Sequence, residues 1–211
     1  VFLSEGITAR RKSGYVNSPQ YDVTHEEMKK MKKEVEIRKK HAKKALKILG
    51  VQQVRFLDLP NQELDQIPLL KIIKEIEREI FETKASIIFT HHYNDLNLDH
   101  RVAYEATITA ARPIPDSKVS SIISFEIPAA TDWRKPYKFN PNLYIDISSQ
   151  LTAKINALKA YQYEFRKPPH PRSKEITDAV AKRWGSLSGF KAAEAFEIIF
   201  SRMNNLKNIS L

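Results

Sequence analysis

Apolar and polar positions follow two periods along the chain, which predict long helices separated by short strands. Apolar residues at three- and four-residue steps predict helices over 25–49, 65–84, 100–112, 151–165 and 174–184. Short apolar runs predict strands over 1–3, 51–59, 85–89, 119–127 and 143–147, with a short closing element over 192–200. This alternation predicts an α/β fold with a Rossmann-like, mostly parallel sheet and helices on both faces.

Local signals support several of these boundaries. Thr24 and Glu27 have the spacing of a capping box, and Gly50 is a stop signal for the same helix. A polar loop is predicted from Gly6 to Asp22. The chain opens on a strand stub without an initiator Met, so we expect the first strand of the sheet to be missing. The length of 211 residues predicts one domain over 1–211, incomplete at its N-terminus.

Composition narrows the chemistry. The chain has no cysteine, which excludes disulfides and thiolate metal sites, so a metal would need His and carboxylate ligands. No apolar run approaches the roughly 20 residues of a membrane span, so none is predicted. The net charge of +10 is concentrated in the helix predicted over 25–49. That helix could attract nucleic acid or anionic lipid, but interspersed Glu residues and the lack of stacking aromatic residues favour a solvated face and no nucleic-acid partner.

Three of the six histidines lie within one short loop. His91, His92 and His100 follow the strand predicted over 85–89 and reach the start of the next helix, with Asp95 and Asp99 among them. Ligands bind at such strand-to-helix loops in open α/β sheets, and these side chains suit a divalent metal such as zinc. The alternative is a polar loop whose Asp and Asn residues only cap and turn. The density of imidazoles and carboxylates favours a site.

The start of the following helix determines what each polar residue can do. Asn97 or Asp99 can cap it, which places His100 in the first turn. The positive helix end there favours a neutral imidazole, the form that binds a metal. Asp99 is adjacent to His100 and so does not face it. We expect Asp99 to cap the helix, or to hold another imidazole or a metal-bound water.

Several motifs stand in order along most of the chain. The central motif is Thr90-His91-His92…Asp95-Leu96-Asn97…Asp99-His100-Arg101. The others, in chain order, are Val1-Phe2-Leu3-Ser4-Glu5-Gly6, Phe56-Leu57-Asp58-Leu59-Pro60, Ala111-Arg112-Pro113, Phe125-Glu126-Ile127-Pro128, Asp146-Ile147-Ser148, Pro169-His170-Pro171-Arg172-Ser173 and Ala193-Glu194-Ala195-Phe196. Together these motifs resemble the PIG-L / LmbE-like family of zinc-dependent N-acetylglucosaminyl de-N-acetylases, with the best match to the bacterial sugar-modifying branch.

The resemblance implies a specific metal site. Family members bind one zinc ion with a His and an Asp of an N-terminal His-Pro-Asp-Asp motif and a His of the later Asp-His pair, and this last ligand maps onto His100. The first Asp of the N-terminal motif is the usual general base. That motif is absent from this chain, so only one of three expected ligands is present and no base maps. We therefore expect a truncated de-N-acetylase; a member that had truly lost the motif would be inactive.

The resemblance also suggests catalytic and substrate-binding residues. Asn97 stands where many members have a His that stabilises the oxyanion, and because Asn can donate a hydrogen bond but not a proton, His91 or His92 could take the protonated role. Asp99 is a further catalytic candidate. Candidate substrate-binding residues are Arg112, His170 and Arg172, although a helix-end cation and a solvated turn are the simpler accounts of these positions.

The predicted function is zinc-dependent hydrolysis of an N-acetyl group on an amino sugar resembling N-acetylglucosamine. One rival is a metal-dependent phosphoesterase, which commonly needs two metals and more carboxylates than 90–101 offers. The second rival is a non-catalytic binding module, which applies if the truncation is real. We expect a small-molecule sugar partner and a cytoplasmic location, and a homo-oligomer remains open.

Overall fold

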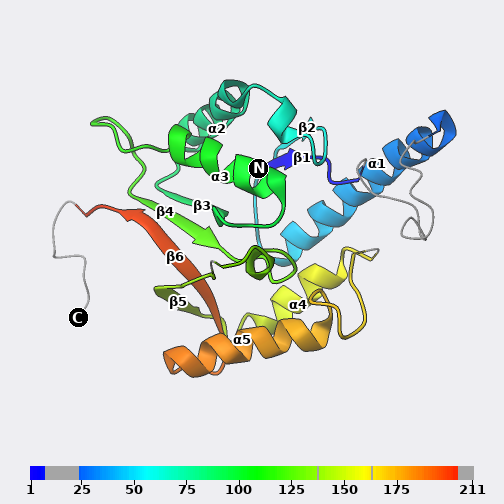
Figure 1. The fold of residues 1–211 in the computed structure, drawn as a ribbon. Helices are drawn as coiled ribbons and strands as arrows, with labels where there is room; N and C mark the ends of the chain where they lie inside the picture. The colour runs from blue at the N-terminus through cyan, green and yellow to red at the C-terminus, as the bar shows by residue number, and fades with distance from the viewer. Residues whose placement is uncertain (8–23, 137, 163, 204–211) are drawn as a thin grey trace. The chain divides into compact units, whose positions relative to one another are not determined.

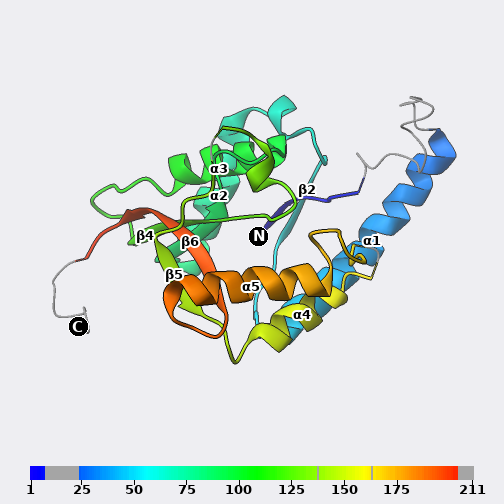
Figure 2. The same ribbon diagram turned by 60° about the horizontal axis from the view of Figure 1, so that its bottom comes forward.

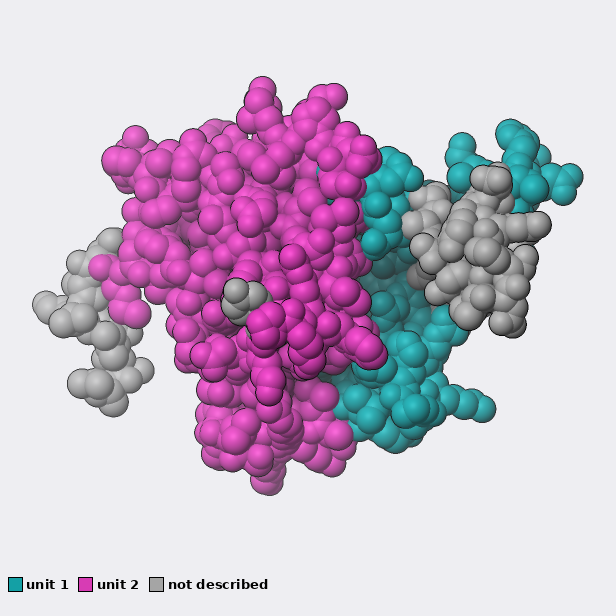
Figure 3. Space-filling view, in the orientation of Figure 1, with its two compact units in different colours: residues 1–64, 149–177 teal, residues 65–148, 178–211 magenta. Residues whose placement is uncertain are grey.

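A computed structural model describes residues 1–7, 24–136, 138–162 and 164–203 (Figure 1). It confirms the α/β class, and within these residues it contains five α-helices and two parallel or mixed sheets. The chain divides into two compact units: unit 1 comprises 1–64 and 149–177, and unit 2 comprises 65–148 and 178–211 (Figure 3). The predicted polar loop before Thr24 lies almost entirely outside the described residues.

Unit 1 pairs two short strands and two helices. Strands β1 (Phe2–Ser4) and β2 (Phe56–Leu59) run parallel, and the rings of Phe2 and Phe56 stack with centroids 5.0 Å apart. Helices α1 (His25–Ile48) and α4 (Leu151–Lys159) lie side by side (Figure 2). Small side chains at the contact allow this close approach; they are Ala45, Ala157 and Ala160.

The local signals at the ends of α1 are confirmed. The Thr24 hydroxyl accepts a hydrogen bond from the backbone N–H of Glu27, and the Glu27 carboxylate accepts one from the N–H of Thr24. This reciprocal pair satisfies two of the amides that a helix start leaves without partners. Past the other end, Gly50 has a φ of +73°, a left-handed conformation that glycine adopts at little cost.

Unit 2 contains a four-stranded sheet in the order β3-β4-β6-β5. Its strands are β3 (Ile87–His91), β4 (Ser121–Phe125), β5 (Leu143–Asp146) and β6 (Ala193–Ser201). β3 and β4 are parallel, whereas β6 runs antiparallel to both β4 and β5. Three of the four strands therefore share one direction, and β6, which lies between β4 and β5, is reversed, so this sheet is mixed.

Three helices pack against this sheet. α2 (Leu69–Thr83) and α3 (Leu98–Ala110) contact each other, and their Ile80 and Ile108 pack on buried Ile122 of β4. α5 (Lys174–Ser188) contributes Trp184 to a second cluster that includes Phe139, Ala193 and Ala195. These two clusters are parts of the core of unit 2.

Two predicted helices have different ends in the structure. α4 ends at Lys159 rather than Phe165, because the chain turns at Tyr161, whose carbonyl accepts hydrogen bonds from the N–H groups of Glu164 and Phe165. α5 continues through Gly185 to Ser188, although Gly185 was expected to break it. A Cβ at Gly185 would lie 2.7 Å from the carbonyl oxygen of Phe190, so glycine here permits close backbone packing.

Two other predicted segments are shorter than expected. The strand predicted over 51–59 is regular only over Phe56–Leu59, and Val51 and Val54 are exposed. The helix predicted from Asp65 begins at Leu69, since a single 3₁₀ turn over Leu64–Gln66 comes before Pro68. None of the described helices is both long and apolar enough to cross a membrane.

Candidate active site

The histidine loop joins the carboxyl end of β3 to the start of α3, within unit 2. Asn97 is the N-cap of α3, and its side-chain oxygen accepts a hydrogen bond of 2.9 Å from the N–H of Asp99. His100 consequently lies in the first turn, as predicted. Asp99 is 5% exposed and lies one residue earlier in the same turn. The site therefore begins at a capped helix end, which holds the position of His100.

Asp95 is the fully buried centre of the loop. One carboxylate oxygen accepts a 2.9 Å hydrogen bond from the Thr131 hydroxyl, and the other accepts one of 2.8 Å from the N–H of Asn97. His100 Nδ1 lies 3.1 Å from that second oxygen, at an angle outside that of an aligned hydrogen bond. Burial raises the pKa of Asp95, but these partners outweigh it and hold the pKa below its ordinary value.

This arrangement orients the His100 ring. With Nδ1 facing the Asp95 carboxylate, Nε2 is the nitrogen that can bind a metal. A carboxylate behind a metal-binding imidazole fixes its tautomer and raises its basicity. The orienting role falls to Asp95. That the adjacent Asp99 does not face His100 stays a prediction.

His91 is a neutral neighbour of His100. The two rings stack with centroids 4.1 Å apart, and Phe125 contacts the His91 ring at 5.0 Å. Burial, reinforced by the charge of His100, lowers the pKa of His91 to about 3. His91 is therefore a neutral imidazole near pH 7 and is not available as an imidazolium acid.

His92 connects the histidine loop to β6 through a side-chain contact with Glu197. It is 1% exposed, its Nδ1 accepts a 3.1 Å hydrogen bond from the N–H of Asn94, and its Nε2 lies 3.1 Å from a carboxylate oxygen of Glu197. Because Nδ1 accepts, we assign the ring proton to Nε2, which donates to Glu197. Burial lowers the pKa of His92, and the opposing effect of Glu197 does not restore it.

Burial of a neutral His92 predicts acid-sensitive stability. Below pH 6.5 the unfolded chain takes up a proton at His92, whereas burial opposes this protonation in the folded chain. The contribution of neutral His92 to the free energy of unfolding is therefore complete above pH 6.5 and is lost as the pH falls. His92→Gln should flatten the pH dependence of the unfolding free energy between pH 6.5 and 5 by up to about 1.4 kcal/mol per pH unit. Urea denaturation at several pH values measures it. The control is His25→Gln, which replaces an exposed histidine. If His92→Gln changes the slope of unfolding free energy against pH no more than this control does, the assignment of a buried, neutral His92 is contradicted.

The residues present do not by themselves form a zinc site. Within the parts of the chain that the structure describes, no three His, Asp or Glu side chains lie together in a group able to hold a metal ion. A catalytic zinc usually has three protein ligands. Of the predicted metal ligands, His100 alone is thus available, with Asp95 behind it.

The predicted substrate-binding residues lie in two places. Arg112 follows α3 in unit 2, where it donates a 2.8 Å hydrogen bond to the Thr109 carbonyl and lies 3.5 Å from a carboxylate oxygen of Glu77. It therefore binds its own helix end, the simpler of the two accounts. His170 and Arg172 lie together in unit 1, where the Arg172 N–H donates to His170 Nδ1 over 3.0 Å. Burial, followed by the nearby arginines, lowers the pKa of His170. A substrate role for these three residues stays a prediction.

Sequence reasoning missed two supports of the loop. Thr131 and Glu197 reach Asp95 and His92 from segments 36 and 105 residues away in sequence, and no local signal marks them. The role of Asp95 did have a signal, because an Asp that accepts a hydrogen bond from the N–H two residues later is a common turn device.

Comparison with known proteins identifies the family. The sequence model of the PIG-L family, described as GlcNAc-PI de-N-acetylase, matches residues 5–111, just over half of the chain. The matched region contains α1, β2, α2, β3, the histidine loop and α3. The chain belongs to the PIG-L family.

Solved structures share the fold at low sequence identity. The N,N'-diacetylchitobiose deacetylase of Pyrococcus horikoshii is 16% identical, with a TM-score of 0.64 over 99% of this chain and 74% of that one. The A40926 pseudoaglycone deacetylase is 19% identical, with a TM-score of 0.61 over 95% and 84%. GalB, the 4-carboxy-2-hydroxymuconate hydratase of Pseudomonas putida, is 18% identical, with a TM-score of 0.66 over 96% and 85%. Because a hydratase shares this fold, the fold alone does not fix the reaction.

Proposed function

We propose that this protein hydrolyses the N-acetyl group of an amino sugar resembling N-acetylglucosamine. The observation that carries the proposal is the His100 imidazole, set in the first turn of a capped helix with the buried Asp95 carboxylate against its Nδ1. Membership of the PIG-L family, described as GlcNAc-PI de-N-acetylase, supports this reaction, and two of the proteins that share the fold are deacetylases. A small-molecule sugar is the proposed partner, and cytoplasmic location and homo-oligomerisation stay predictions.

Zinc is the proposed cofactor, with His100 Nε2 as one ligand. A bound zinc ion supplies a water molecule of lowered pKa and polarises the acetyl carbonyl. The described residues offer no complete set of ligands, so the proposal requires donors beyond them. The Asp95 carboxylate contributes by holding the His100 ring in one orientation.

Asn97 is the proposed oxyanion donor. Its side-chain oxygen is engaged by the N–H of Asp99, which leaves the amide N–H₂ group to donate a hydrogen bond. Asp99 stays a candidate for proton transfer at the same helix end. The lowered pKa values of His91 and His92 work against a protonated role for either residue.

Release of free amine from N-acetylated sugars tests the proposed reaction. The protein expressed from its gene would be incubated with N-acetylglucosamine or N,N'-diacetylchitobiose, with zinc or with a chelator. We expect equal amounts of amine and acetate to appear with zinc. If no acetate is released from any N-acetyl sugar after zinc loading, the proposal fails and the binding-module alternative takes its place.

Removal of the negative charge of Asp95 beside His100 should weaken zinc binding and activity without abolishing them. Asp95→Asn keeps the shape of the side chain, but the neutral amide no longer supports the imidazole, so we expect about 10- to 100-fold lower activity or zinc affinity. Zinc titration and initial rates measure the two effects. The matched control is Asp65→Asn, in the 3₁₀ turn outside the loop. Equal behaviour of the two variants would remove Asp95 from the site.

A further inference from the structure

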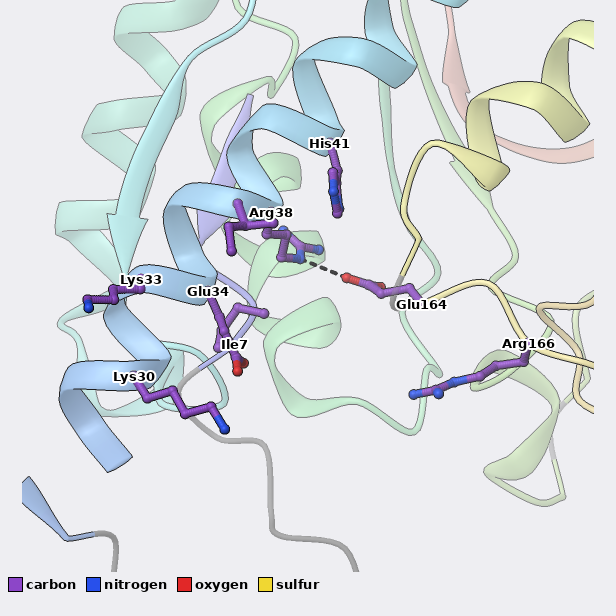
Figure 4. A pocket seen from close by; sticks show the side chains of 9 residues that line it. Ile7, Lys30, Lys33, Glu34, Arg38, His41, Glu164 and Arg166 are labelled. Carbon is purple, nitrogen blue, oxygen red and sulfur yellow. Dashed lines mark hydrogen bonds and ion pairs between the residues drawn. The ribbon is translucent and has the colours of Figure 1, made fainter. Parts of the chain in front are cut away.

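Unit 1 contains a cavity of about 550 Å³ that lies outside the histidine loop (Figure 4). Its volume falls within the range of small-molecule sites, about 300–1,000 Å³. One wall is a face of α1, because lining residues recur along that helix at three- and four-residue steps: Lys30, Lys33, Glu34, Ile37, Arg38 and His41. The rest of the described lining is Ile7, Glu164 and Arg166.

The lining carries more positive than negative charge. Four of its residues are Lys or Arg and two are Glu. Glu164 already forms two ion pairs: one of its oxygens lies 2.9 Å from Arg38 Nε and the other 3.1 Å from Arg172 Nη1. In contrast, neither Lys30 nor Arg166 has an ion-pair partner within 4 Å among the described residues. Two cations at this cavity are therefore available to an anionic ligand.

The two available cations face each other. Lys30 extends from α1 and Arg166 from the segment after α4, and Figure 4 shows their charged ends directed toward the same open space. Lys33 points away from this space in the same view. An anion between Lys30 and Arg166 would contact both an ammonium and a guanidinium group.

Arg38 gives the cavity a fixed wall. Besides its bond to Glu164, its guanidinium lies 5.8 Å from the ring centroid of Tyr161 and packs against Gly6. A Cβ at Gly6 would lie 2.7 Å from Arg38 Cζ, so glycine is what allows this contact. A cation held on three sides needs little ordering when a ligand binds, which favours affinity.

We propose that this cavity binds the phosphate group of a small phosphorylated sugar. Lys30 and Arg166 would hold the phosphate, and the apolar side chains of Ile7 and Ile37 would contact the organic part. None of the nine described lining residues is Phe, Tyr or Trp, and His41 is the one ring among them that could stack on a nucleobase. The proposal does not depend on the deacetylase reaction, because its measurement is binding.

Calorimetric titration of glucose 1-phosphate into the protein tests the proposal. We expect saturable binding that weakens about tenfold or more in the double variant Lys30→Gln/Arg166→Gln, since each charge-assisted contact contributes that order of affinity. The matched control is Lys40→Gln/Lys43→Gln, which removes two exposed charges from α1 outside the cavity and should change the affinity less than about threefold. Circular dichroism confirms that both variants fold.

Two results would overturn the proposal. One is the absence of saturable binding to the unmodified protein, and the other is an equal loss in both double variants, which would indicate a general effect of helix charge. Inorganic phosphate is the second probe. Weaker binding of inorganic phosphate than of glucose 1-phosphate supports contacts from Ile7 and Ile37, whereas equal binding would show that the site does not recognise the sugar.

Discussion

His100→Ala is expected to lower kcat/KM for an N-acetylated sugar by at least about a thousandfold, or about 4 kcal/mol of transition-state stabilisation. The variant removes the one predicted metal ligand among the described residues and leaves the Asp95 carboxylate without the imidazole that it faces. His100 Nε2 has no substitute in the loop, because His91 stacks on the His100 ring and His92 is bound to Glu197.

The control for this variant is His25→Ala, which removes an exposed imidazole at the start of α1. We expect it to retain activity within about twofold, as surface substitutions usually have little effect. Initial rates of amine release, measured at the same concentration of added zinc, give both values. Activity of His100→Ala within tenfold of the unmodified protein would contradict the metal-ligand role.

Trp184→Ala should destabilise the protein by about 3–5 kcal/mol, the usual cost of removing a large buried aromatic side chain. Trp184 is 6% exposed and contacts Phe139 and Tyr144 edge-on or tilted, with ring centroids 6.3 and 6.2 Å away. Its indole N–H also donates a 2.6 Å hydrogen bond to Glu126, which would be left without this donor.

Trp184→Phe separates packing from hydrogen bonding. Phenylalanine keeps most of the apolar contact but cannot donate a hydrogen bond to Glu126. We therefore expect a smaller loss of stability than for Trp184→Ala, of which about 1–2 kcal/mol comes from the lost hydrogen bond and the rest from the smaller ring. Urea denaturation of both variants measures the free energies of unfolding. A cost below about 1 kcal/mol for Trp184→Ala would show that the cluster around α5 is not part of the core that maintains the fold.

Features set by neighbouring residues could be predicted from the sequence. The capping box at Thr24 and the position of His100 in the first turn of α3 follow from side chains within a few residues, and both are present in the structure. The family motif also lies in one continuous segment. Local sequence was therefore enough to find the loop and to place its most informative residue.

Features set by the packing of the folded chain could not be predicted. Gly185 looked like a helix end, but its missing side chain admits the backbone of Phe190 and the helix continues. Thr131 and Glu197 complete the histidine loop from other segments, and their spacing along the chain follows no rule.

The basic helix α1 shows how one segment can have two roles. Charge counting favoured a solvated face, and Lys40 and Lys43 are indeed exposed. Another face of the same helix lines the unit 1 cavity with Lys30. Composition records the number of charges but not which of them face a cavity, so this distinction required the structure.

The zinc content of the protein expressed from its gene, measured by elemental analysis beside that of its His100→Ala variant, tests the central claim most directly. We predict about one zinc ion per chain in the unmodified protein and none in the variant. Two metal ions per chain would favour the phosphoesterase alternative. The absence of zinc from both proteins would contradict a zinc-dependent deacetylase that uses His100.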